Sequence, residues 1–225
     1  MRRCVFASVL PFALSGCSVW FFSGENGVDR SHPVVLVETT GGVELGAATE
    51  FGVLTLGRTA TTGPCRVHYF LGPTPVIEDG EMTATGSLFV RADIDLKTMA
   101  VRALDHDPGA DQELFVMWTP DGTTTRSVPV RRAHDDAIDG DALLDPGVAL
   151  PVGATVLHRH RESGLLFAGL VAGTAEVECN GGVRRYYVYA GVDRVRELLA
   201  VPQLHPRDQV PRYRTDDITV LKPAK

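Results

Sequence analysis

The stretch F-G-V-L-T-L-G-R-T-A, residues 51–60, decides how the rest of the chain is read. Its first six residues are largely apolar or β-branched, and a glycine follows them at position 57, which predicts a short strand that ends in a turn. Arg58, a permanent cation, comes directly after that glycine. The segments on either side show what kind of domain this strand belongs to.

Strand patterns of the same kind recur along the chain. A first group of strands is expected at residues 34–38, 42–47, 51–56, 66–71, 87–92 and 97–104. An acidic, turn-rich break at residues 105–112 separates them from a second group at residues 113–118, 123–131, 147–157, 164–173, 174–179 and 184–190. Two groups of six short strands predict an all-β chain in two halves.

One helix is expected near the C-terminus, at residues 191–201. Its apolar stripe repeats at helical spacing, and Pro202 stops it. The stripe consists of Val192, Val195, Leu198 and Leu199. Residues 202–225 form a Pro-rich, charged tail, in which residues 218–221 are a candidate final strand.

The N-terminus has the pattern of an export signal. Arg2 and Arg3 precede an apolar segment that is too short to span a bilayer. The sequence L-S-G-C at residues 14–17 resembles a lipobox, the bacterial lipoprotein signal in which Cys17 becomes the lipidated first residue. We therefore expect residues 1–16 to be a signal peptide and residues 17–32 to be the lipidated cysteine and a tether. Ser18 favours sorting to an outer membrane that faces the periplasm.

Cleavage at this site leaves Cys65 and Cys179 as the only cysteines besides the lipidated one. Export implies an oxidising compartment, where a disulfide between them is a candidate and two separate buried thiols are the alternative. The net charge of −6 and the pI near 5.6 argue against a nucleic-acid partner.

Five stretches, in the same order along the chain, resemble the trypsin-like serine protease family, especially its bacterial envelope branch. Residues 51–59 resemble its G-x-V-L-T-A-A-H-V stretch, and residues 92–104 resemble D-x-x-x-D-L-A-V-L-x-V. Residues 145–157 lie where G-D-S-G-G-P should fall. Residues 163–173 and 186–199 resemble the strand after the nucleophile and the closing strand and helix. The resemblance implies two six-stranded β-barrels, at residues 33–104 and 113–201, and a short C-terminal helix.

The same resemblance places Arg58, Asp95 and Ala149 at the positions of the catalytic histidine, aspartate and serine. A serine hydroxyl needs a neutral base to take its proton and a carboxylate to orient that base. Arginine stays protonated and alanine has no hydroxyl, so only the aspartate is retained. The paired glycines that shape the oxyanion hole are also missing near Ala149. No catalytic residue is therefore expected, and the chain is predicted to be a pseudoprotease.

Three other motifs are weaker. Ser163 is a candidate nucleophile but lies too close to the following strand. His158 and His160 alternate as metal ligands on a strand would, without a third ligand nearby. Residues 135–141 are acidic but lack the ligand spacing of a calcium loop. No metal and no cofactor are expected.

The sequence thus predicts a cell-envelope lipoprotein, held on a membrane by its lipid anchor, whose inactive trypsin-like domain binds a peptide or protein or acts as a scaffold. Two alternatives stay open: an active serine endopeptidase whose catalytic residues lie elsewhere, and an unrelated structural β-sandwich lipoprotein.

Overall fold

The computed structural model describes residues 32–59, 62–71, 74–85, 89–94, 100–109, 112–133, 141–160, 164–179, 182–200 and 220–221. The lipobox, Cys17 and most of the tail lie outside these ranges, as do Asp95 and Ser163. No helix within the described ranges is long and apolar enough to cross a membrane.

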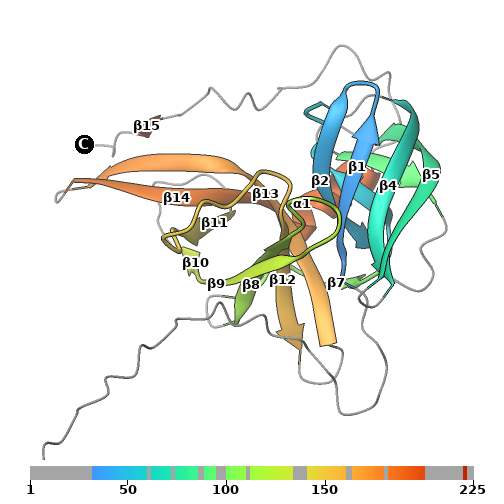
Figure 1. Cartoon of the computed structure of the whole chain (residues 1–225). Helices are drawn as coiled ribbons and strands as arrows, with labels where there is room; N and C mark the ends of the chain where they lie inside the picture. Colours follow the sequence, from blue (N-terminus) through green and yellow to red (C-terminus); the bar gives the residue numbers. More distant parts are fainter. Residues whose placement is uncertain are drawn as a thin grey trace, which may run out of the picture.

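The first six strands form a closed barrel, at the right of Figure 1. They are β1 (Val34–Thr39), β2 (Gly42–Thr49), β3 (Gly52–Thr55), β4 (Gly63–Leu71), β5 (Thr74–Thr85) and β6 (Phe89–Asp93). Their spatial order is β1-β2-β3-β6-β5-β4, and β4 pairs back onto β1. The alternation expected in β4 is present, because Cys65, Val67 and Tyr69 are buried in the barrel while Arg66 is exposed.

The second half repeats this order. Its strands are β8 (Leu114–Trp118), β9 (Arg126–Val130), β10 (Arg132–Ala133), β11 (Asp141–Leu144), β12 (Thr155–His160), β13 (Gly164–Cys179) and β14 (Gly182–Gly191). They pair along the path β10-β11-β14-β13-β12-β8-β9, and only Arg131 separates β9 from β10. Taken as one bent strand, β9 and β10 complete a ring of six in the same order as the first barrel. The expected all-β fold with two barrels is therefore confirmed, and the β-sandwich alternative is wrong.

Helix α1 (Val192–Ala200) follows β14. Val192, Val195 and Leu198 of the expected stripe are buried, which confirms the face that packs on the second barrel. In Figure 1 the hairpin of β13 and β14 extends well beyond this barrel. The short strand β15 (Val220–Leu221), within the expected 218–221, pairs in parallel with β13.

The linker joins the two barrels along its length. Val101 exchanges backbone hydrogen bonds of 3.0 Å with Ala48 and Glu50 of the first barrel. Strand β7 (Arg102–Ala103) then runs parallel to β13, and Leu104 N donates to Phe167 O at 2.9 Å. Buried residues of the first barrel and of the second belong to one apolar cluster. The two barrels therefore share a hydrophobic core and are not independently packed domains.

Several expected strands differ from those observed. The expected strand at 97–104 is wrong for the first barrel: of its described residues, 100–104, two form a strand, and this strand pairs with the second sheet. The sixth barrel strand is β5, which the sequence analysis did not predict. Likewise β11 begins at the end of the acidic segment 135–141, where no strand is predicted, residues 147–154 are not a strand, and the two strands expected at 164–179 are one.

Candidate functional site

Arg58 lies in a hollow between the two barrels. It follows β3 directly, and the hollow, of about 220 Å³, is lined by Arg58 and Glu44 of the first barrel and by Val152 and Gly153 of the second. A second hollow of about 280 Å³ adjoins it and shares Val43, Glu44 and Leu45 with it. The two hollows border the same stretch of β2 at the junction of the barrels, and together they are here called the inter-barrel groove.

Glu44 on β2 fixes the turn that carries Arg58. Its carboxylate accepts a hydrogen bond from Gly57 N at 3.1 Å, one from Thr59 Oγ1 at 3.2 Å and one from Thr59 N. These donors on both sides of Arg58 hold the backbone so that the intervening side chain reaches the second barrel. There Arg58 Nη2 donates to the carbonyl oxygen of Ala172 on β13 at 2.7 Å.

The surroundings of Arg58 destabilise the charged form of its side chain. Partial burial lowers the pKa of its guanidinium, and the nearby carboxylate of Glu44 acts in the opposite direction. An arginine remains protonated even so, because its unperturbed pKa lies far above neutrality. A permanent cation therefore occupies the place where the family resemblance puts the catalytic base, and it cannot accept a proton from a nucleophile.

The loop that carries Ala149 borders the same groove. It connects β11 to β12, Pro151 lines one hollow, and Val152 and Gly153 line the other. Tyr187 of β14 anchors the loop, since its hydroxyl accepts a hydrogen bond from Leu150 N at 3.2 Å. Ala149 itself is exposed. Two of the three segments that the resemblance aligns with the triad thus border the groove, whereas Asp95 lies outside the described residues.

Gly153 sets how closely the barrels approach. A Cβ at this position would lie 2.6 Å from the carbonyl oxygen of Leu45, and the backbone φ is +84°. Both conditions favour glycine, because a side chain would clash with backbone and strain the turn. The barrels are consequently in direct backbone contact beside the hollow that contains Arg58.

The candidate disulfide is not formed. Cys65 is a free thiol, buried inside the first barrel among apolar side chains, and burial raises its pKa. Cys179 ends β13 at the far tip of the second sheet, which also contains β14 but no strand of the first barrel. A residue pattern cannot supply the Cα separation that a disulfide needs.

The two histidines of the candidate metal motif differ in burial. His158 on β12 is buried, and its Nδ1 lies 3.0 Å from Glu113 O, whereas His160 is exposed. Among the described residues no group of three or more His, Cys, Asp or Glu side chains is arranged to hold a metal ion. Of the acidic segment 135–141, only Asp141 lies in the described part of the chain.

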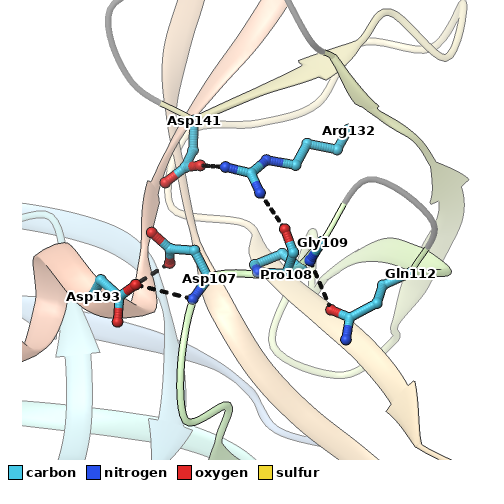
Figure 2. Close-up of polar contacts among 7 residues, drawn as sticks. All are labelled: Asp107, Pro108, Gly109, Gln112, Arg132, Asp141 and Asp193. Carbon is cyan, nitrogen blue, oxygen red and sulfur yellow. Dashed lines mark hydrogen bonds and ion pairs between the residues drawn. The ribbon is translucent and has the colours of Figure 1, made fainter.

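Asp141 belongs to a carboxylate cluster that fixes the linker, shown in Figure 2. Asp107 N donates to Asp193 Oδ2 at 3.1 Å, and Asp193 N donates back to Asp107 Oδ1 at 3.1 Å. Arg132 bonds both Pro108 O and the Asp141 carboxylate. Burial raises the pKa of Asp107 to about 6, and the neighbouring carboxylates of Asp141 and Asp193 add to the shift. We call these five residues the linker clasp.

The parts of the site that depend on tertiary contacts carry no recognisable sequence pattern. The pattern at residues 42–47 predicts Glu44 only as part of a strand, and Ala172 contributes a backbone carbonyl, which no residue type reveals. The outward position of Glu44 on an alternating strand was the one available hint. The linker clasp joins residues more than eighty positions apart, so no local pattern predicts it.

Comparison with known proteins returned structures but no sequence relatives. No family model and no curated protein matches the chain. Similar solved structures include tobacco etch virus protease (10% identity, TM-score 0.47, 80% of this chain and 83% of that chain). They also include the Rv3671c protease of M. tuberculosis in its active form (15%, 0.41, 80% and 84%) and kallikrein-related peptidase 10 with Zn²⁺ (10%, 0.48, 73% and 91%). At TM-scores below 0.5 the fold assignment rests on the strand order described above.

Proposed function

We propose that this chain is a catalytically inactive relative of the trypsin-like serine proteases, anchored in a bacterial cell envelope, and that it binds a peptide or protein segment in its inter-barrel groove. One observation carries the proposal: Arg58 lies in the groove and donates to Ala172 O. The permanent cation stands in place of a base.

The loss of chemistry follows from residue identities. Serine attack on an amide needs a hydroxyl, a neutral imidazole to remove its proton and a carboxylate to orient the imidazole. The groove contains the guanidinium of Arg58 instead, and the loop that borders it carries Ala149, which has no hydroxyl. His158 is engaged elsewhere, since its Nδ1 lies 3.0 Å from Glu113 O. His68 Nε2 lies 3.3 Å from Glu38 Oε1 and has no hydrogen-bond partner among the described residues.

The groove retains features that suit an extended peptide. Its walls are mainly apolar, and Val43 exposes 56% of its surface there. Binding in such a groove removes apolar area from water, which is the main driving force for peptide docking. The lipid anchor at Cys17 would hold this groove near a membrane, on the periplasmic face of an outer membrane.

The test is a peptidase assay that separates this proposal from the active-enzyme alternative. The full chain, solubilised in detergent, is incubated with casein and with a serine-directed fluorophosphonate probe. We expect neither hydrolysis nor labelling, with trypsin as the positive control. Hydrolysis that disappears in Ser163→Ala would contradict the proposal and establish an active serine endopeptidase.

A further inference from the structure

The hollow beside Arg58 combines a half-buried cation with apolar walls. Four apolar side chains, those of Val43, Leu45, Leu56 and Val152, line it together with Arg58. A guanidinium has five N–H donors, and in the described part of the chain Arg58 has one hydrogen bond, to Ala172 O. The other N–H groups have no hydrogen-bond partner among the described residues, and they suit a ligand that brings negative charge.

Glu44 does not fully neutralise the charge of Arg58. Its two carboxylate oxygens accept hydrogen bonds from Gly57 and Thr59, on either side of Arg58. Those donors spread its negative charge over the turn. Burial still lowers the pKa of Arg58 despite the carboxylate nearby, so the cation is incompletely compensated. A second carboxylate, aimed at the free N–H groups, would complete the compensation.

The size of the hollow restricts the ligand further. At about 220 Å³ it is smaller than the roughly 300–1,000 Å³ of small-molecule sites, so it holds about one amino-acid residue. The last residue of a peptide delivers a carboxylate and a side chain together, which matches a cation among apolar walls. An internal Asp or Glu would leave the apolar walls uncovered and bury two peptide groups as well.

We infer that the inter-barrel groove captures the C-terminal carboxylate of a polypeptide that ends in an apolar residue, with Arg58 as the carboxylate-binding side chain. This inference rests on the proposed function, because a peptide with a free carboxylate resembles a cleavage product that an inactive site would retain. The ligand is held by a charge-assisted, forked hydrogen bond to the guanidinium, and its last side chain packs on Val43 and Leu45.

The experiment is a fluorescence anisotropy titration of the full chain in detergent micelles. The probes are fluorescein-labelled hexapeptides ending in Val, Leu, Ile or Phe, each made as the free acid and as the C-terminal amide. A third set carries an internal Asp and an amidated end. We expect at least one free acid to bind about 10- to 100-fold more tightly than its amide, as a hydrogen bond to a charged group implies.

Variants assign the effect to the groove. Arg58→Gln should reduce the affinity for the free-acid peptide to that for the amide. Arg66→Gln, which changes an exposed arginine on the first barrel, should leave both affinities unchanged. Val43→Ser keeps the cation and replaces an exposed apolar side chain, so it should weaken acid and amide equally. Thermal unfolding of each variant shows that it is folded.

Three results would overturn the inference. They are equal binding of acids and amides, equal binding of the internal Asp peptides and the free acids, and no binding of any probe. The proposed function is tested by a different measurement on the same samples. Hydrolysis of the probes, detected by mass spectrometry, would contradict it.

Discussion

Asp107 shows what the fold does to a single residue. Its carboxyl is partly buried between Asp193 and Asp141, and its pKa rises from 3.8 to about 6. The folded chain therefore holds a proton between about pH 4 and pH 6 that the unfolded chain has released. Stability contributed by that proton is fully present below about pH 4 and falls as the pH rises to about 6.

Replacing Asp107 by asparagine mimics the protonated acid at every pH. The amide oxygen can still accept from Asp193 N, and the amide nitrogen can donate to the Asp141 carboxylate. We expect Asp107→Asn to be more stable at pH 7.5 by about 1 kcal/mol, after discounting for the solvent screening of a half-exposed group. For a chain of this size that is about 2–4 °C in Tm, and the gain should vanish at pH 4.

Asp121→Asn is the control for that measurement. Asp121 is fully exposed, and hydrogen bonds from Thr123 N and Thr124 N lower its pKa to about 2. Its stabilising contribution is present above about pH 4 and is lost as the pH falls towards 2, the opposite sign to Asp107. A gain in Tm at pH 7.5 for Asp121→Asn, or none for Asp107→Asn, would contradict the assignment.

Gly191 explains how the carboxylates of the linker clasp come so close. A Cβ on it would lie 2.4 Å from Asp107 Oδ1 and 2.4 Å from Asp141 Oδ2. Its backbone is not left-handed, so the cost of a side chain is steric alone. We expect Gly191→Ala to lose about 1–3 kcal/mol in urea unfolding, the usual range for overpacking. A Cβ at Gly109 would have no atom within 4 Å, so Gly109→Ala should leave the free energy of unfolding unchanged. Equal losses of stability in the two variants would show that steric crowding at Gly191 is not the cause.

At the scale of single elements, β14 offers a comparison between two tyrosines. The Tyr187 hydroxyl contacts Leu150 N at 3.2 Å and Val148 O at 3.4 Å, whereas the buried Tyr189 hydroxyl has no partner among the described residues. We expect Tyr187→Phe to lose about 0.5–1.5 kcal/mol and to speed amide exchange at Leu150. Tyr189→Phe should be neutral or stabilising. If both variants behave alike, Tyr187 does not anchor the loop.

The elements that the sequence predicted are those whose burial is periodic. Helix α1 has apolar residues at helical spacing, and β4 alternates, so both were expected within a few residues of their observed bounds. Strand β5 contains Pro75 and Gly80, and it carries Asp79 and Glu81 on its exposed face; these residues conceal the strand. Strand β11 is a short segment after an acidic stretch. Pairing with β14 forms it, and no local pattern shows that pairing.

The candidate site, like the strands, was predictable only where a local residue pattern marks it. Arg58 came from a motif that lies at the end of a strand, and the structure places it in the inter-barrel groove. Its partners Glu44 and Ala172 come from β2 and β13, which only the docking of the two barrels brings together. Cys65 and Cys179 failed as a pair for the same reason, since the sequence does not show which sheet each one enters.

At the scale of the whole molecule, the linker determines how the groove is held. Residues 101–104 hydrogen-bond to β2 on one side and to β13 on the other, and the linker clasp then fixes residues 105–108 to α1 and β10. The groove walls come from the same two barrels. Their geometry is therefore coupled to the linker and to the shared core.

The lipid anchor proposed above would be attached to Cys17. When the full-length chain is expressed in a bacterium, the wild type should sediment with the membrane fraction and partition into the detergent phase of Triton X-114, since a multiply acylated cysteine anchors a protein stably. Cys17→Ser should remove the acceptor and shift the chain to the aqueous phase. Cys4→Ser, within the expected signal peptide, should partition as the wild type does. Aqueous partitioning of the wild type, or detergent partitioning of Cys17→Ser, would show that the groove is not presented from a lipid anchor at this residue.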